Sequence, residues 1–139
     1  MDETPAPLRP IGLTTERRES PLGVDRTVPL LAWKLAATGR DRKQSAYRIR
    51  VVVDGDPTDP DVRSVWDSGV VRSAQSVDIP YGGEPLRSRT RYVWAVRVFD
   101  ESDRDSGWSE PAWFETAFLD PSEWNSEQES SWIGMAGEP

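Results

Sequence analysis

The 139-residue chain contains no cysteine and no histidine, and the two absences exclude several kinds of chemistry. Without cysteine there is no disulfide framework, no thiolate nucleophile and no cysteine-ligated metal. Without histidine there is no Ser-His-Asp triad, no imidazole general base and no histidine-ligated metal. Of the two lysines, Lys34 falls on the polar side of an expected strand and Lys43 in a charged turn, so neither is expected to be desolvated as a lysine nucleophile must be. We expect no cofactor.

Positive charge is also in short supply, because 24 acidic residues outnumber 17 basic ones and give a net charge of -7. An acidic chain is a poor candidate for nucleic-acid binding, which depends mainly on Lys and Arg contacts to phosphates. The first residues lack the basic and apolar regions of a signal peptide, and no apolar run is long enough for a membrane helix. We therefore expect a monomeric, cytoplasmic protein that contacts no membrane, unless the chain is a piece of a longer, secreted one.

Alternation of apolar and polar residues is the main structural signal. In residues 46–53 the apolar side chains from Tyr47 to Val53 recur at every second position, and residues 91–99 repeat this pattern. Such alternation predicts half-buried β-strands. Shorter strand candidates lie at residues 11–15, 30–35, 65–66, 70–71, 77–79 and 113–118. The pattern predicts an all-β, two-sheet sandwich of about seven strands over residues 11–119, with no helix. Residues 1–10 are expected to be a flexible lead and residues 120–139 a mobile linker.

The seven tryptophans have two readings, packing in the core or stacking against sugar rings. Trp33 and Trp94 fall on apolar strand faces and are expected in the core. Trp66 and Trp108 lie nearest to loops, so they are the candidates for a sugar-stacking platform. Packing at the end of the core is the simpler explanation for both. Tyr92 is expected to bond through its hydroxyl to upstream backbone, as a tyrosine corner does.

Four arginines on the two long strands point away from the expected core, and they are Arg48, Arg50, Arg91 and Arg97. If these strands are neighbours, the four side chains form a basic stripe on an acidic protein. The simpler interpretation is a solvated sheet face with cross-strand pairs to Asp or Glu. The functional interpretation is a docking face for a partner domain, with arginine as the anchor.

Carboxylates are the only catalytic groups present in quantity. A glycosidase needs two of them at a fixed separation and in a cleft that raises the pKa of one, and the sequence shows no such setting. The Asp-rich segment from Asp54 to Asp61 suggests a calcium loop, but it lacks the glycine and glutamate of an EF-hand. We interpret it as a solvated hairpin loop and expect neither a metal site nor a catalytic one.

The spacing of Leu86, Tyr92, Trp94 and Val96, followed by a polar loop and Gly107-x-Ser109, resembles the fibronectin type III pattern. More narrowly, the chain resembles the N-terminal domain of bacterial α-L-rhamnosidases of glycoside hydrolase family 78. The similar stretches are Leu30–Leu35, Gln44–Val51, Val65–Ser73, Tyr92–Val98 and Trp108–Thr116. The most specific piece is Trp-Asp-Ser-Gly at residues 66–69, followed by Gln75-Ser76.

The resemblance also implies a role. In such enzymes carboxylates of a separate helical barrel remove terminal rhamnose with inversion, and no residue of that barrel is recognisable here. Trp124 and Trp132-Ile133-Gly134 resemble the opening of the following domain. The resemblance therefore implies a non-catalytic accessory domain that packs against downstream domains of the same polypeptide. A carbohydrate-binding module is the alternative.

Overall fold

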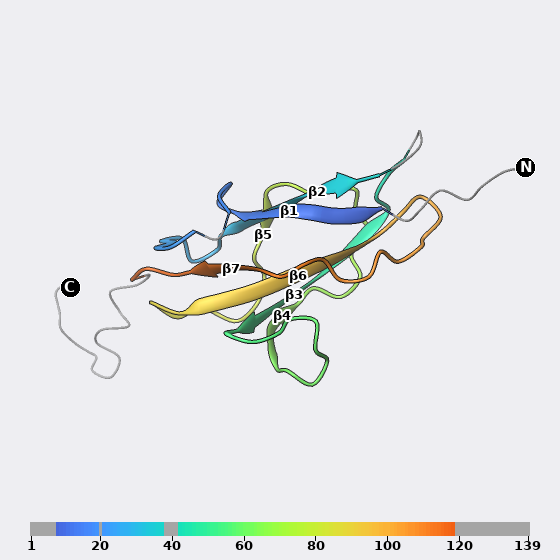
Figure 1. Ribbon diagram of the computed structural model, residues 1–139. Coiled ribbons are helices and arrows are strands. Elements are labelled where there is room, and N and C mark those ends of the chain that lie inside the picture. The colour runs from blue at the N-terminus through green and yellow to red at the C-terminus, as the bar shows by residue number, and fades with distance from the viewer. Residues whose placement is uncertain (1–7, 20, 38–41, 119–139) are drawn as a thin grey trace, which may run out of the picture.

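The chain folds as two antiparallel β-sheets (Figure 1). The computed structural model describes residues 8–19, 21–37 and 42–118, and within them there is no helix. The strands are β1 (Arg9–Thr15), β2 (Leu30–Ala36), β3 (Ala46–Val53), β4 (Ser64–Asp67), β5 (Ile79–Pro80), β6 (Arg91–Phe99) and β7 (Ala112–Glu115). One sheet has the order β1-β2-β5 and the other β4-β3-β6-β7. The predicted all-β sandwich of about seven strands is confirmed.

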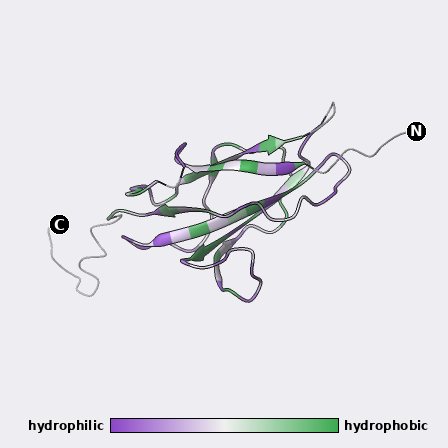
Figure 2. Cartoon of the chain, viewed as in Figure 1, coloured by the Kyte–Doolittle hydropathy of each residue, from purple (hydrophilic) through white to green (hydrophobic). Residues whose placement is uncertain are grey.

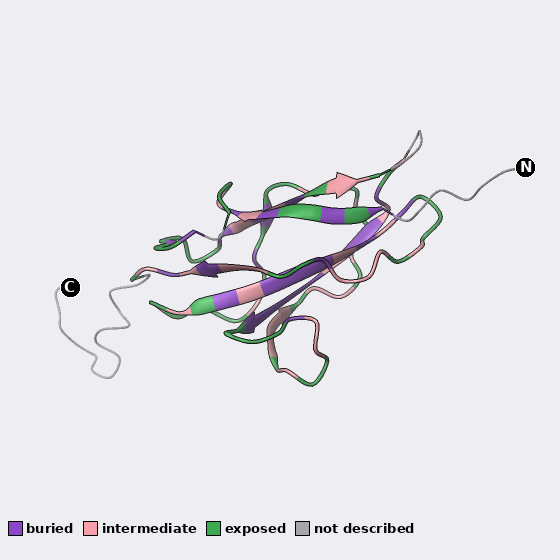
Figure 3. Cartoon of the chain, viewed as in Figure 1, coloured by how far each residue is buried: buried purple, intermediate pink, exposed green. Residues whose placement is uncertain are grey.

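The core lies between the sheets and is built by the alternating residues that the sequence singles out. Trp33 of β2 is 2% exposed, and Trp94 of β6 is fully buried. Their predicted place in the core is confirmed. Alternation is visible as bands along β6, both in hydropathy (Figure 2) and in burial (Figure 3). Burying each large aromatic side chain contributes roughly 2–3 kcal/mol, so these residues account for much of the stability.

Tyr92 forms the expected tyrosine corner. Its hydroxyl accepts a hydrogen bond of 2.8 Å from the backbone N–H of Arg87, and its ring stacks on Phe114 with centroids 5.4 Å apart. Leu86, the residue before Arg87, is buried at the same end of the core. The corner therefore fixes the loop before β6 to the strand that follows it.

Replacing Tyr92 by phenylalanine should lower the free energy of unfolding by about 1 kcal/mol, because the Arg87 N–H loses its acceptor while the ring stays in place. Urea denaturation measures the change. Tyr47→Phe is the matched control, since the Tyr47 hydroxyl has no hydrogen bond to any residue in the described part of the chain. Equal losses in the two variants would contradict the role given to the corner.

Several strand boundaries differ from the expected ones. β1 begins at Arg9 rather than residue 11, and Leu8 just before it is buried in the core. Residues 70–71 form no strand, only an isolated bridge between Val71 and Tyr47. Short apolar pairs bounded by Ser and Gly carry too little pattern to set strand ends. The interpretations of residues 1–7, Trp124, Trp132 and the segment after residue 118 lie outside the described residues.

Candidate functional site

The outer face of the sheet β4-β3-β6-β7 carries the side chains that the sequence marks as candidates. β3 and β6 are neighbours, and Arg48 lies directly opposite Arg97. Two like charges in direct register repel each other unless they are neutralised. Each has a carboxylate partner, because Arg48 pairs with Asp67 at 2.6 Å and Arg97 with Asp105 at 2.6 Å. The two strands are neighbours, which is the condition for a shared arginine stripe, and Arg48 and Arg97 on them are each paired with a carboxylate.

The two carboxylates sit in identical Asp-Ser-Gly turns, at residues 67–69 and 105–107. In each turn the Asp carboxylate accepts the glycine N–H and receives two hydrogen bonds from the arginine. Gly69 and Gly107 have φ values of 65° and 77°, which a glycine adopts without steric cost. The repeated turn thus positions both Arg–Asp pairs in the same way.

The serines of the Asp-Ser-Gly turns attach them to the central strands. Ser68 Oγ accepts the N–H of Ile49 on β3, and Ser106 Oγ accepts the N–H of Val98 on β6. Each hydroxyl also donates to the carbonyl of the following glycine. The hydrogen bonds of Arg48 hold the pKa of the Asp67 carboxyl below its usual range, against the effect of burial. A carboxyl with a lowered pKa is unsuited to act as a general acid at neutral pH.

Trp108 follows the second turn and lies over both paired arginines. The guanidinium carbon of Arg97 is 4.9 Å from the ring centroid, and that of Arg48 is 5.8 Å away. Ser109, next in the chain, is bonded in both directions to the backbone of Val96. The half-buried ring is therefore held by cation–π contacts and by its anchored neighbour. We call Trp108 with Arg48, Arg97, Asp67 and Asp105 the Trp108 cluster.

Arg50 differs from the other three arginines because it is buried. Only 7% of it is exposed, although it points to the outer face. Its guanidinium donates to the carbonyls of Pro57, Asp59 and Val62, which belong to the loop after β3. This loop folds back over the face and covers Arg50. The expectation of an exposed Arg50 is corrected by this placement.

A shallow cavity of about 320 Å³ lies between this loop and the Trp108 cluster. Thr58 and Pro60 line it from the loop and Ser64 from β4. The remaining lining residues are Arg48, Arg50, Asp67, Arg97 and Trp108. Its walls are mostly polar, and its volume is at the lower end of the range for small-molecule sites.

A second aromatic–arginine group lies at the far end of the same face. Arg91 of β6 places its guanidinium carbon 4.0 Å from the ring centroid of Trp113 on β7. Arg91 also pairs with Glu115 at 3.0 Å, directly across the strands. Arg97 lies six positions after Arg91, so the Cα atoms of the two arginines are roughly 20 Å apart along β6.

Trp66 lies on the inner side of β4, away from this face. Its half-buried ring packs against the core and meets Tyr81 edge-on, with centroids 5.4 Å apart. Gly83 approaches it so closely that a Cβ there would lie 2.4 Å from the Trp66 Cβ. The ring has neighbours on the protein side that fix its orientation. Of the two sugar-stacking candidates, Trp108 lies beside the cavity described above.

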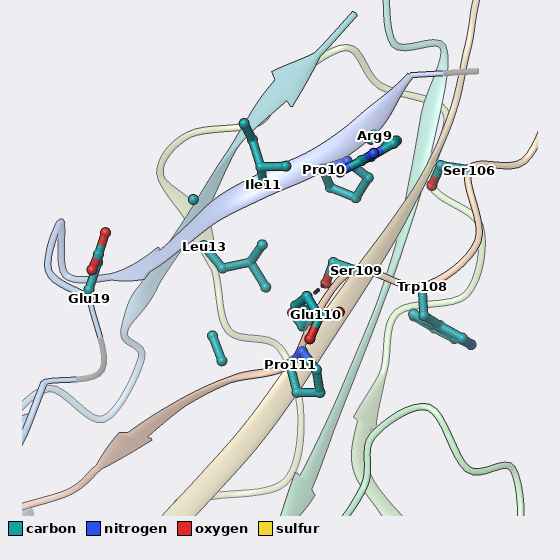
Figure 4. A pocket seen from close by; sticks show the side chains of 12 residues that line it. Arg9, Pro10, Ile11, Leu13, Glu19, Ser106, Trp108, Ser109, Glu110 and Pro111 are labelled. Carbon is teal, nitrogen blue, oxygen red and sulfur yellow. Dashed lines mark hydrogen bonds between the residues drawn. The ribbon is translucent and has the colours of Figure 1, made fainter. Parts of the chain in front are cut away.

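A larger groove of about 470 Å³ runs between β1 and the segment before β7 (Figure 4). Pro10 and Leu13 line one side, and Glu110 and Pro111 the other. Trp108 also belongs to the lining of this groove, and Figure 4 shows its ring pointing away from Leu13. Two carboxylates line the groove, Glu19 and Glu110, and Figure 4 shows them well apart from each other.

Three properties of the described residues bear on function. They contain no group of three Asp or Glu side chains placed to hold a metal ion. No helix among them is long and apolar enough to cross a membrane. Where the pKa of an Asp or Glu is displaced, it is lowered, as for Asp67 and Asp103, whose hydrogen-bond partners favour the charged form.

Comparison with known proteins gives a consistent set of relatives. Residues 10–120 match the family described as "Rha78A-like, N-terminal immunoglobulin domain". An α-L-rhamnosidase of Streptomyces avermitilis is 43% identical over 120 residues, and one of Formosa agariphila is 36% identical over 121. The matched segment is 86–87% of this chain but only 11–12% of those relatives.

Solved structures agree with the sequence relatives. The crystal structure of the Streptomyces avermitilis α-L-rhamnosidase complexed with L-rhamnose matches with a TM-score of 0.76 and 44% identity. The α-L-rhamnosidase from Dictyoglumus thermophilum matches with a TM-score of 0.77 and 34% identity. Each match covers 84% of this chain, but only 11% and 13% of the respective structures.

Proposed function

Because this chain belongs to the family of Rha78A-like N-terminal immunoglobulin domains, we propose that it is a non-catalytic accessory domain of an α-L-rhamnosidase. In the whole enzyme, hydrolysis of terminal α-L-rhamnose falls to two carboxylates outside this domain, working with inversion. The lowered carboxyl pKa values and the absence of histidine and cysteine support this division of labour. The domain packs against other parts of the same polypeptide and stabilises them.

Trp113 with Arg91 and Glu115, which we call the Trp113 group, is the basis of the proposed docking surface. Trp and Arg are the residue types most enriched where protein interfaces are buried. Here both are held in place before any contact, since Arg91 is fixed by Glu115 and lies over the ring. Groups already ordered lose less side-chain entropy on association. Phe118, 51% exposed and 5.0 Å from the Arg89 guanidinium carbon, adds a further apolar contact at this end.

A chimaera tests the docking surface. Residues 10–120 replace the matched segment of the Streptomyces avermitilis relative, and the melting temperature is compared with and without Trp113→Ala. We expect this substitution to lower the melting temperature of the chimaera by several degrees more than that of the isolated 139-residue chain, because only the chimaera loses a buried contact.

Val77→Ala is the matched control, since Val77 is 58% exposed and lies beside the other sheet. It should lower the two melting temperatures equally. If Trp113→Ala also has the same effect in both proteins, the docking surface is not at Trp113. Rhamnoside hydrolysis is measured in parallel for the chimaera and for the isolated chain. Any hydrolysis by the isolated chain, however slow, would contradict the non-catalytic role.

The second candidate function is carbohydrate binding, and the cavity beside Trp108 is the observation that favours it. Aromatic rings stack on the C–H faces of sugars, and arginine and carboxylate side chains bind their hydroxyls. Trp108 borders the cavity together with Arg48 and Asp67. Trp113 and Arg91 do not line this cavity, so the two functions do not exclude each other.

A further inference from the structure

The cavity beside Trp108 has an unequal charge on its walls. Three guanidiniums line it, those of Arg48, Arg50 and Arg97, but only one carboxylate, that of Asp67. Asp105 neutralises Arg97 from outside the lining. Arg50 gives its hydrogen bonds to main-chain carbonyls and has no ion-pair partner among the described residues. The charge of Arg50 acts through space on the carboxylates of Asp56 and Asp67, so the positive excess is confined to the lining residues themselves, three guanidiniums against one carboxylate.

Donors also remain available at the cavity. Arg48 and Arg97 each use Nε and Nη2 on their carboxylates, which leaves Nη1 of both without a hydrogen bond to the described residues. The two arginines are directly opposite on adjacent strands, so their Cα atoms are about 5 Å apart. A guanidinium donor prefers a carboxylate acceptor, and charge-assisted bonds are roughly twice as strong as neutral ones.

The other walls suit a sugar ring. Trp108 offers the exposed part of an indole, and Pro60 offers an apolar surface from the loop. Ser64 Oγ makes no hydrogen bond within the described residues, and Thr58 Oγ1, which donates to Asp56, can still accept. These hydroxyls match the ring hydroxyls of a carbohydrate, which donate and accept.

We propose that this cavity binds a pyranose ring carrying a carboxylate, that is, a uronic acid unit. The carboxylate lies against Nη1 of Arg48 and Arg97, the C–H face of the ring packs on Trp108, and the ring hydroxyls reach Ser64 and Thr58. This inference rests on the second proposed function, carbohydrate binding, and adds the chemical class of the sugar. A neutral hexose would leave the Nη1 donors of Arg48 and Arg97 without a charged acceptor.

Titration of the 139-residue chain with sodium D-glucuronate and D-galacturonate, followed by tryptophan fluorescence and heteronuclear NMR, tests the proposal. We expect saturable binding that is at least about tenfold tighter than that of D-glucose, D-galactose or L-rhamnose. Chemical shifts should change at Trp108 and not at Trp113. Binding should weaken as salt is added, because screening reduces the attraction between the charges.

Trp108→Ala and Arg97→Gln should each weaken uronate binding at least about fivefold, whereas Trp113→Ala, the matched Trp–Arg pair, should leave it unchanged. The NMR spectrum of each variant shows whether it is folded, and Arg97→Gln remains informative if Trp108→Ala is not. Equal affinity for neutral sugars overturns the charge argument but leaves carbohydrate binding. An affinity for acetate equal to that for the uronates overturns the proposed contribution of the sugar ring. No saturation by any sugar up to about 50 mM overturns both, and the accessory role is untouched.

Discussion

Replacing Asp100 by asparagine should lower the free energy of unfolding by about 3 kcal/mol, a large share of the stability of a domain of this size. The Asp100 side chain is fully buried at the end of β6. Its carboxylate lies 2.8 Å from the Arg104 guanidinium and 3.6 Å from that of Arg42, and it accepts the N–H groups of Ser102 and Arg104. Asparagine keeps the shape but removes the buried negative charge that faces both guanidiniums, and Arg42 then keeps only its pairing with Glu101 at 3.0 Å among the carboxylates described.

The same residue gives the stability a dependence on pH. Burial opposes the charged form of Asp100, but the backbone N–H groups of Arg104 and Ser102 and the Arg104 guanidinium outweigh it, so the pKa lies below its usual range. A pKa that is lower in the folded state stabilises the fold above about pH 4, the unfolded value, and this contribution is lost as pH falls through the folded value. Asp100→Asn should therefore lose less stability on acidification than the parent chain.

Urea denaturation at pH 7 and pH 3 measures both effects. Glu110→Gln is the control, because it removes one carboxylate from an exposed position at which no side-chain hydrogen bond or ion pair is found within the described residues. A loss of stability from Asp100→Asn no larger than that from Glu110→Gln would show that the buried carboxylate contributes little.

Arg50→Met should cost about 2 kcal/mol and release the loop that follows β3. Methionine keeps much of the length and apolar stem of arginine, but the carbonyls of Pro57, Asp59 and Val62 lose their donors. The loop should then become open to proteases while the two sheets remain intact. Limited proteolysis at several urea concentrations separates local opening from global unfolding.

Arg63→Met provides the comparison for Arg50→Met. Arg63 lies near the end of the same loop, but its side chain is 73% exposed and its partner is the exposed Glu84. Exposed ion pairs contribute little, so we expect almost no change in stability or cleavage. If Arg50→Met is cleaved no faster than the Arg63 variant, the three carbonyl contacts do not hold the loop.

The strands were predictable because their signal is local. Period-two alternation fixes which side of a strand each residue faces, and β3 has the predicted bounds from Ala46 to Val53. The pattern does not say what covers the outer side. Arg50 and the fully buried Val52 both point outward, and the loop that follows β3 folds back and buries them. This is why exposed and buried arginines could not be told apart from the sequence.

Part of the candidate site could be predicted from the sequence. The sequence placed Trp108 and the arginines Arg48 and Arg97, and the tripeptide Asp-Ser-Gly occurs twice, at residues 67–69 and 105–107. That repeat is the signal that could have revealed the paired turns, but its meaning depends on β4 and β6 both lying next to β3. The cavity itself could not be predicted, since it requires the path of the loop over the sheet.

The pairing of β3 with β6 also sets how the chain must fold. Its register runs from Ala46 opposite Phe99 to Val53 opposite Tyr92, so even the nearest pair closes a long stretch of chain that contains β4 and β5. The entropy of closing such a loop is lost before most of the contacts form, which makes folding slow, in the range of milliseconds to seconds. During that interval the apolar sides of both strands are open to solvent. The arginines on β3 and β6 make the opposite sides of these strands charged, so neither strand is apolar on both sides. The charged residues of the outer face thus protect the nascent sheet from pairing with other chains before its own partners arrive.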